Sequence, residues 1–346
     1  MRCIGGREMH SCGKEGTQVK KTKKYFRKTF LLCLPLILIG WVIEVQAQEK
    51  YPTRAINIIV PFTPGGSTDM AARAMAPFLT KRWKVPVNVV NKPGGNTIPG
   101  TFEVYSSPPD GHTMLSDGLP MCSLLDVVVK DLPFKVMDRT FIAMTVFNPM
   151  VTICPSSAPY KTLHDLIADA KKDPENFTWD SLGGVSGDDF VGRMVMNAGK
   201  IDIPKTKPVM SKGGSAAATL VAGGHIKMGH PALITAWPHI QAGTVRVLAV
   251  ALKERDPLVP EVPTHAELGY PSVYCPFWLG VSGPPKMPSH IVDAWAKAIQ
   301  DMMKDPEYLA LIKKQFFRPF YHGPKEMMEY IKKESEHARI VYGVKK

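Results

Sequence analysis

The sequence predicts an α/β fold with mainly parallel sheets, and three observations support this. Short runs of β-branched and apolar residues alternate with segments of helical periodicity, which is typical of strands joined by crossover helices. Glycine-rich loops follow several of the runs, where strands would pass into helices. The 346 residues correspond to about two domains of ordinary size, and 45% of them are hydrophobic, which is sufficient for a substantial core.

Residues 1–47 have the organisation of a secretory signal peptide. A basic segment, Lys20–Lys28, precedes the uncharged, largely apolar segment Thr29–Ile43. The residues Val45-Gln46-Ala47 then offer a cleavage site of the small-residue type. We therefore expect export to the periplasm and cleavage after Ala47.

A membrane anchor is the alternative interpretation of the apolar segment. It is disfavoured because a spanning helix needs about 20 apolar residues and because Pro35 interrupts this segment. The segment before Lys20 is long for a signal peptide, so we expect translation to start downstream, near Val19. Half of the formal net charge of +12 lies in residues 1–47, and the rest of the chain has no basic stripe of the kind that binds nucleic acid.

The mature chain begins with two strands, each followed by a glycine-rich loop. Ile56–Val60 is the first strand, and the loop Pro61–Asp69 leads into a helix at Met70–Trp83. Val85–Val90 is the second strand, and the loop Asn91–Asn96 follows it. Further strands are expected at Thr113–Leu115, Met150–Cys154, Thr178–Leu182 and Val245–Ala251, and further helices at Leu163–Lys172, Phe190–Ala198, Ala216–Ala222, Ile291–Lys304, Pro306–Phe316 and Pro324–Tyr342.

The loop Pro64–Asp69 is the strongest local indication of a binding site. Gly65 and Gly66 allow the backbone to approach a ligand closely, and the first amide groups of the following helix attract a carboxylate or phosphate. Thr68 or Asp69 is expected to cap that helix. An ordinary strand–helix turn is an equally good interpretation of this loop taken alone. A nucleotide-binding phosphate loop is not indicated, because neither Lys-Ser nor Lys-Thr follows the glycines.

Catalytic and metal sites are not indicated. The loop Gly183–Gly187 lacks the second glycine of a hydrolase nucleophile elbow, because Asp188 stands where it is required. Asp188 and Asp189 have no third ligand at metal spacing, so we expect surface or helix-capping carboxylates. No cofactor-binding motif is present, so no cofactor is predicted.

Several single residues are weighed by type and position. His230 is a candidate for ligand binding because it follows a predicted strand, and Phe62 is one because it lies beside the first glycine loop. Aromatic residues are more often part of the core, and this is the expectation for Trp237, Phe277 and Trp278. The cysteines of the mature chain, Cys122, Cys154 and Cys275, allow at most one disulfide.

The order of five sequence blocks resembles that of one receptor family, the Bug-type (TctC-like) receptors of tripartite tricarboxylate transporters. The resemblance extends from about Tyr51 to Tyr342. The blocks are Ile59-Val60-Pro61-Phe62-x-Pro64-Gly65-Gly66-x-x-Asp69-x-x-Ala72-Arg73, Asn91-Lys92-Pro93-Gly94-Gly95-Asn96, Pro109-Asp110-Gly111-x-Thr113, Pro238-His239-Ile240-x-Ala242-Gly243-x-x-Arg246-x-Leu248-Ala249-Val250 and Val262-Pro263-Thr264-x-x-Glu267-x-Gly269.

The resemblance implies a two-lobed periplasmic binding protein of the type II-like class, each lobe a mainly parallel sheet flanked by helices. Residues 48–150 and 272–346 would form lobe 1, and residues 151–271 would form lobe 2. The family pattern places ligand-binding residues on two walls of the interlobe cleft. These are Phe62, Thr63, Gly65, Gly66, Ser67, Thr68 and Asp69 on the first wall and Ser181, Gly184, Val185 and Ser186 on the second, with Pro64, Asn96 and His230 as further candidates.

The implied function is that of a receptor without catalytic activity. It would capture a small carboxylate (a di- or tricarboxylate, an acidic amino acid or an aromatic acid) and deliver it to the membrane permease of a tripartite tricarboxylate transporter. The alternative is a sensor that presents the solute to a membrane histidine kinase. An exported hydrolase is disfavoured because no serine or histidine has the partner that a nucleophile needs. Three departures from the family pattern fall in lobe 2 and leave the ligand open: Asp189 where His is frequent, Lys227 where Asp is frequent and Ser211 where Tyr is usual.

Overall fold

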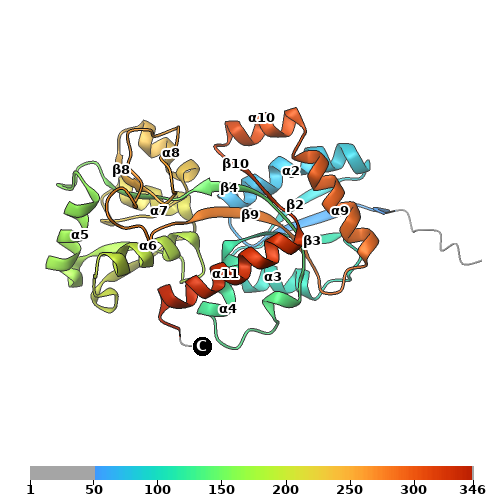
Figure 1. Ribbon diagram of the computed structural model, residues 1–346, viewed down its shortest axis with the longest axis horizontal. Coiled ribbons are helices and arrows are strands. Elements are labelled where there is room, and N and C mark those ends of the chain that lie inside the picture. The colour runs from blue at the N-terminus through green and yellow to red at the C-terminus, as the bar shows by residue number, and fades with distance from the viewer. Residues whose placement is uncertain (1–50, 345–346) are drawn as a thin grey trace, which may run out of the picture. The chain divides into compact units, whose positions relative to one another are not determined.

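A six-stranded sheet is the largest sheet of the computed structural model, which describes residues 51–344 (Figure 1). The predicted signal peptide and its cleavage site lie outside these residues. In the order in which they lie in the sheet, the strands are β10 (Arg318–His322), β4 (Thr140–Pro149), β9 (Pro276–Gly283), β3 (Thr113–Gly118), β1 (Ile56–Val60) and β2 (Val87–Asn91).

The direction of the strands confirms the predicted α/β class with a mainly parallel sheet. β1 pairs in parallel with β2 and with β3, and β4 runs in the same direction as these three. β9 lies antiparallel between β3 and β4, and β10 is antiparallel to β4. The sequence did not indicate β4, β9 or β10. All residues of β9 and most of those of β4 are buried, so neither strand shows the alternation of polar and apolar residues that marks a half-exposed strand.

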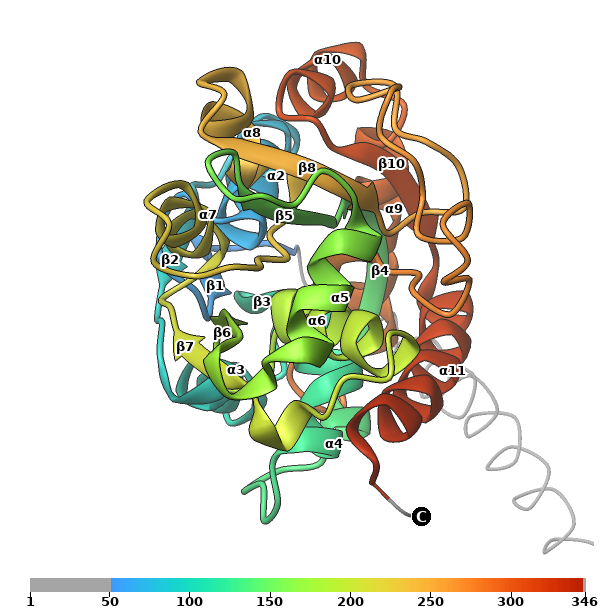
Figure 2. The same cartoon turned by 90° about the vertical axis from the view of Figure 1, so that its left-hand side faces the viewer.

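Two small sheets come from the middle of the chain. β5 (Val151–Pro155) pairs antiparallel with β8 (Val245–Val250), and Figure 2 shows the two side by side. β6 (Thr178–Ser181) pairs in parallel with β7 (Lys207–Met210). All four strands come from residues 151–271, the range predicted for lobe 2. The division into lobes at these boundaries stays a prediction.

Helices connect the strands and cover the sheets. Their bounds are α2 (Ser67–Trp83), α3 (Ile98–Tyr105), α4 (Leu125–Val128), α5 (Leu163–Lys172), α6 (Gly187–Ala198), α7 (Gly214–Ala222), α8 (Leu233–Gln241), α9 (Ser289–Met302), α10 (Pro306–Lys314) and α11 (Pro324–Tyr342). α5 and α11 have the predicted bounds. The predicted cap of the first helix is wrong: Gly66 is the N-cap of α2, and no side chain caps this helix. No helix in residues 51–344 is long and apolar enough to cross a membrane.

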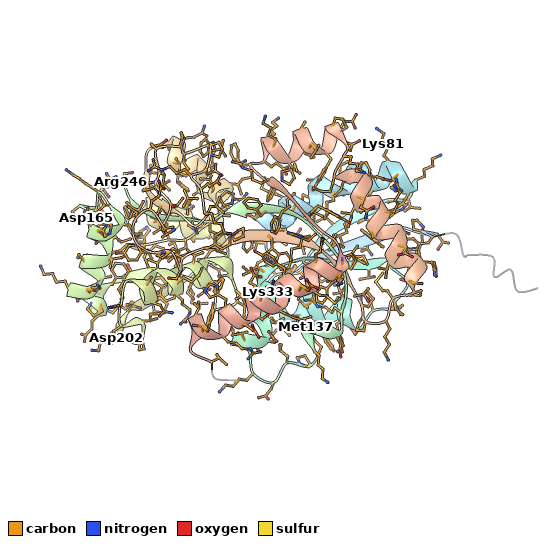
Figure 3. All side chains as sticks on the ribbon, viewed as in Figure 1. Lys81, Met137, Asp165, Asp202, Arg246 and Lys333 are labelled. Atoms are coloured by element: carbon orange, nitrogen blue, oxygen red, sulfur yellow. The ribbon has the colours of Figure 1, made fainter. Side chains whose placement is uncertain are left out.

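The core is formed by apolar side chains on both sides of the sheets. Trp179, Trp278 and Trp295 are among its largest fully buried members. Cys122, Cys154 and Cys275 are also buried, and all three are free thiols. Charged side chains such as Lys81, Asp165 and Asp202 lie at the periphery (Figure 3). α11 packs against β4 and against α6, and the amide group of Asn197 donates a hydrogen bond to the carbonyl of Val341 at 2.9 Å.

Candidate functional site

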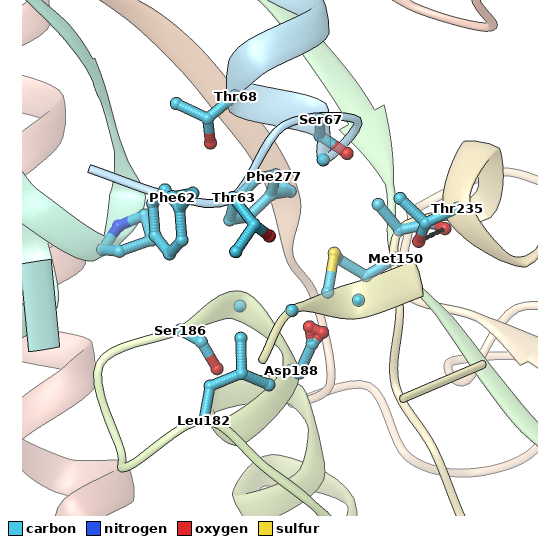
Figure 4. Close-up of a pocket in the computed structure, with 16 residues that line it drawn as sticks. Phe62, Thr63, Ser67, Thr68, Met150, Leu182, Ser186, Asp188, Thr235 and Phe277 are labelled. Atoms are coloured by element: carbon cyan, nitrogen blue, oxygen red, sulfur yellow. Dashed lines mark hydrogen bonds between the residues drawn. The ribbon is translucent and has the colours of Figure 1, made fainter. Parts of the chain in front are cut away.

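The loop after β1 and the loop after β6 face each other across one pocket (Figure 4). Its cavity volume is about 50 Å³. The two glycine-rich loops that the sequence singled out therefore share a crevice. The pocket is lined by Phe62, Thr63, Gly66, Ser67, Thr68, Pro120, Met150, Leu182, Ser186, Gly187, Asp188, Gly213, Gly214, Ala232, Thr235 and Phe277.

Four α-helices begin at this pocket. α2 begins at Ser67, α6 at Gly187 and α7 at Gly214, and all three residues line it. α8 begins at Leu233, and its N-cap Ala232 lines the pocket as well. The first amide groups of a helix have no partner within the helix, and they carry a partial positive charge. No lysine, arginine or histidine is among the lining residues. The pocket therefore offers backbone donors, rather than basic side chains, to a negatively charged oxygen.

The first wall is held by Asp69, which lies in the first turn of α2. Its carboxylate accepts hydrogen bonds from the amide of Gly65 at 2.9 Å and from the side chain of Asn91 at 2.8 Å. Arg73 donates to the same carboxylate at 3.0 Å. Burial tends to raise the pKa of Asp69, but these hydrogen bonds outweigh burial and lower the pKa below its usual value. The amide of Gly65 is thus bonded within the loop and is turned away from a ligand.

The second wall is held by Asp189, which lies in the first turn of α6. Its carboxylate accepts hydrogen bonds from the hydroxyl groups of Ser181 at 2.6 Å and Ser186 at 2.7 Å. The amide of Leu182 donates to it at 2.8 Å. Ser186 is the N-cap of α6 and accepts a hydrogen bond from the amide of Asp189. The carboxylate of Asp189 therefore folds residues 181–186 into a tight turn.

Two further acids lie beside this turn. Asp180 and His230 are both fully buried, and Asp180 Oδ1 lies 3.3 Å from His230 Nδ1. Burial raises the pKa of Asp180, although His230 offsets part of this effect. Asp188 is 6% exposed and lines the pocket, and its Oδ2 atom has no hydrogen-bond partner. The expectation that Asp188 and Asp189 are surface or capping carboxylates is wrong as to exposure, because both are buried.

A second pocket adjoins the first and shares Phe62, Thr63 and Leu182 with it. Its cavity volume is about 510 Å³. The hydroxyl group of Thr63 donates a hydrogen bond to the carbonyl of Lys212 at 3.3 Å, and this bond links the loop after β1 to the loop that precedes α7. The second pocket is lined by Pro61, Phe62, Thr63, Pro93, Gly94, Gly95, Asn96, Thr97, Leu182, Val185, Met210, Ser211 and Lys212.

The structure brings together a part of the predicted site. The predicted site residues that line the first pocket are Phe62, Thr63, Gly66, Ser67, Thr68 and Ser186. The predicted site residues that line the second pocket are Phe62, Thr63, Asn96 and Val185. The remaining candidates, Pro64, Gly65, Asp69, Ser181, Gly184 and His230, line neither of these two pockets. Asp69 and Ser181 instead support the two walls through hydrogen bonds.

Other residues that line the first pocket were not predicted from the sequence as binding residues. Phe277 was expected in the core, and it is only 8% exposed, but it also lines the pocket. A Cβ atom at Gly187 would lie 2.6 Å from this ring, so glycine is required where α6 begins. Met150 and Thr235 carry no local signal, because their place in the pocket depends on strands and helices far away in the sequence.

Comparison with known proteins identifies the family that this site belongs to. Residues 71–343 match the family described as "Tripartite tricarboxylate transporter family receptor" (TctC). A UPF0065 protein in the gbd 5' region of Cupriavidus necator is 30% identical over 301 residues, which cover 84% of this chain and 88% of the relative. Protein BugT of Bordetella pertussis is 28% identical over 293 residues, covering 83% and 88% of the two chains.

Solved structures show the same fold. MatC (Rpa3494) of Rhodopseudomonas palustris with bound malate has a TM-score of 0.77 at 22% identity, covering 84% of this chain and 99% of that one. The periplasmic binding protein BugD has a TM-score of 0.77 at 24% identity, covering 85% and 98%. R. palustris Rpa4515 with adipate has a TM-score of 0.79 at 23% identity, covering 85% and 99%. These findings confirm the family resemblance and the periplasmic-binding-protein fold that the sequence predicted.

Proposed function

This chain belongs to the tripartite tricarboxylate transporter receptor (TctC) family, and on that premise we propose that it captures a small carboxylate in the first pocket. Members of the family are solute-binding receptors, so the expectation that the chain is not an enzyme is confirmed. In the proposed complex, a carboxylate group of the ligand lies at the start of α2, near Ser67 and Thr68.

One observation carries this proposal: four helices begin at a pocket that has no basic side chain among its lining residues. Each helix start contributes the equivalent of about half a positive charge. Several such starts favour an anion without the strong desolvation cost of a buried lysine or arginine. Malate and adipate, which occupy MatC and Rpa4515 respectively, are both small carboxylates and support this ligand class.

The proposal includes the place and the partner of the receptor. We infer that residues 1–47 direct the chain to the periplasm and are removed after Ala47. The two lobes would close on the ligand by a hinge motion, with residues 151–271 moving as lobe 2. The closed form would then deliver the ligand to the permease of a tripartite tricarboxylate transporter.

Binding is tested by isothermal titration calorimetry with a panel of mono-, di- and tricarboxylates at pH 7. We expect at least one ligand with a Kd near the micromolar range, because a few charge-assisted hydrogen bonds of about 1.5–3 kcal/mol each are available. Ser67→Ala removes a hydroxyl donor of the first wall and should weaken binding about tenfold. Ser215→Ala is the matched control, because Ser215 lies in the first turn of α7, is exposed and does not line the pocket.

Two results would contradict the proposal. A folded protein that binds no carboxylate in the panel would contradict the ligand class. Equal effects of Ser67→Ala and Ser215→Ala would contradict the place of the ligand. Delivery is tested separately, by measuring uptake of the labelled ligand in cells that lack this receptor or the permease. Undiminished uptake in both deletions would contradict the proposed partner.

A further inference from the structure

Asp188 is the acidic side chain that lines the first pocket. It is 6% exposed, and its Oδ2 atom is buried without a hydrogen-bond partner. Figure 4 shows it on the wall opposite Ser67 and Thr68. Burial of an unpaired carboxyl oxygen is costly, and in native proteins such atoms are nearly always satisfied. Because no group of the described residues bonds Oδ2, a bound ligand is a possible source of its partner.

The usual role of an acid in the first turn of a helix accounts for only part of this position, because the carboxyl group bonds its own amide and Oδ2 still has no partner. Asp188 is the second residue of α6, but the cap of the helix is the hydroxyl of Ser186, and the turn before the helix is held by Asp189. Asp188 makes no hydrogen bond to another residue within residues 51–344.

The charged groups around Asp188 do not neutralise it either. On α6, its neighbour Asp189 is acidic, and on β6 the nearest charged group is Asp180. His230, which precedes α8, is directed to Asp180 Oδ1. Cys275, which precedes β9, is a buried thiol whose pKa burial raises. Burial, followed by the two acids, raises the pKa of Asp188 well above its usual range. The surrounding groups of the chain therefore do not stabilise its ionised form, whereas a positive or hydrogen-donating group of a ligand at Oδ2 would do so.

The opposite wall of the pocket, at the start of α2, suits a negatively charged group of the ligand. Ser67 is also 6% exposed, lines the pocket and has an unpaired hydroxyl oxygen. It lies at the start of α2, where an anionic oxygen is stabilised. One wall thus suits a carboxylate, and the other presents a lone acid. A ligand that fits both carries a carboxylate and a hydrogen-bond donor within one small molecule.

We propose that Asp188 is a specificity-determining residue that accepts a hydrogen bond from a hydroxyl or ammonium group of the bound carboxylate. The proposal rests on the proposed function and narrows it: the ligands would be hydroxy or amino carboxylic acids, and carboxylates without a donor would bind weakly. The physical reason is discrimination by an unpaired buried group, since a site built to accept a hydrogen bond rejects an analogue that cannot supply it.

The test is calorimetry with three probes that share one carbon skeleton. Succinate, malate and aspartate differ only at carbon 2, which carries hydrogen, a hydroxyl or an ammonium group. We expect malate or aspartate to bind at least about tenfold more tightly than succinate. Propionate, lactate and alanine form a second matched set for a shorter ligand, and adipate and benzoate test carboxylates that carry no donor.

Variants of Asp188 separate recognition from folding. Asp188→Ala should weaken the binding of malate and aspartate, because the acceptor of their hydroxyl or ammonium group is removed, and should leave that of succinate nearly unchanged. The ratio should then fall to within about threefold. Asp188→Asn keeps an amide oxygen as acceptor, so it should retain the preference for a hydroxyl and lose that for an ammonium group. Asp293→Ala, an exposed acid on α9, is the control for the change in net charge.

The possible outcomes distinguish a role of Asp188 in ligand recognition from a role in folding alone. Equal affinity for donor-bearing and donor-free carboxylates, or a preference for adipate or benzoate, would overturn the role of Asp188. Equal weakening of all three four-carbon probes in Asp188→Ala would mean that the residue only supports the fold. Failure of every carboxylate to bind the folded wild type would instead overturn the proposed function, and the two failures are therefore distinguishable.

Discussion

Asp69 and Asp189 occupy the same place on the two walls of the pocket, since each is the third residue of its helix. Each accepts a hydrogen bond from the amide of the loop that precedes it, from Gly65 in one case and from Leu182 in the other. A carboxylate in the first turn of a helix suits the positive end of the helix and ties a flexible loop to a rigid element. Both walls therefore have the same kind of internal support.

The residues one position earlier differ. Thr68 is the second residue of α2, whereas Asp188 is the second residue of α6, and both line the pocket. The first wall thus presents hydroxyl groups and helix amides to the ligand, and the second wall adds a buried acid. Under the two proposals above, the first wall would hold the carboxylate group of the ligand and the second wall would select among ligands.

The largest expected effect separates the two supporting acids. Asp189→Ala leaves two hydroxyl groups and one amide without their buried acceptor, so it should lower the free energy of unfolding by about 3 kcal/mol. Asp69→Ala should cost about 1–2 kcal/mol, because its partner Arg73 is half exposed and can turn to water. Urea denaturation followed by circular dichroism measures both. Equal losses of unfolding free energy in the two variants would contradict the idea that the exposed partner Arg73 makes the loss of Asp69 less costly.

The next effect compares two glycines. A Cβ atom at Gly187 would approach the ring of Phe277 to 2.6 Å, so Gly187→Ala should cost about 2 kcal/mol and push the ring into the pocket. Gly65 has a φ of +82° but open space around it, so Gly65→Ala should cost about 1 kcal/mol through backbone strain alone. Ligand affinity measured by calorimetry should fall in the first variant far more than in the second. A normal affinity in Gly187→Ala would argue against a ligand beside Phe277.

The same two walls show how far the sequence reaches. It predicted both glycine-rich loops, and β1, α5 and α11 have the predicted bounds. α2, α6 and α7 begin earlier than expected, because periodicity becomes visible only at the first apolar residue and the preceding turn is polar or small. That missing turn is the one that reaches the pocket, so the predicted helices begin too late in the chain at the place where the site lies.

The role of Asp188 was also beyond local sequence. Asp188 and Asp189 have no third ligand at metal spacing, so surface or helix-capping carboxylates were the expectation. Phe277 and Thr235, which line the same pocket, lie far away in the chain and reach it through β9 and α8. Only the packing of these elements converts a surface acid into a buried one.

A smaller effect concerns pH and has opposite signs on the two walls. The pKa of Asp188 is raised in the folded state, so the folded state holds its proton longer, and stability falls as pH rises from about 4 through the folded pKa. Asp188→Asn does not titrate. It should therefore stabilise the ligand-free protein by about 1 kcal/mol at pH 7.5, and the gain should vanish near pH 4.

Asp69 provides the opposite case. Its pKa is lowered in the folded state, so its contribution to stability is present at neutral pH and is lost as pH falls below about 4. Asp69→Asn should therefore be destabilising at pH 7.5 and neutral in acid. Urea denaturation at several pH values measures the free energy of unfolding of both variants. A stabilisation by Asp188→Asn that grows on acidification would contradict a raised pKa of Asp188.

The smallest expected effect concerns Tyr342, the last residue of α11, which forms a hydrogen bond with the second wall. The hydroxyl group of Tyr342 donates a hydrogen bond to the carbonyl of Gly184 at 2.6 Å, and its ring stacks on Phe190. Tyr342→Phe keeps the ring and removes one hydrogen bond, so it should lower the free energy of unfolding by at most about 1 kcal/mol.

The effect of Tyr342→Phe on ligand binding distinguishes support from control. If Asp189 is the main support of residues 181–186, affinity measured by calorimetry should change by no more than about twofold. Tyr330→Phe is the matched control, since Tyr330 lies on the same helix and packs against Trp278 instead. A tenfold loss of affinity in Tyr342→Phe alone would show that the shape of the second wall depends on α11 more than on Asp189. Asp69 and Asp189 would then not be equivalent supports of the two walls.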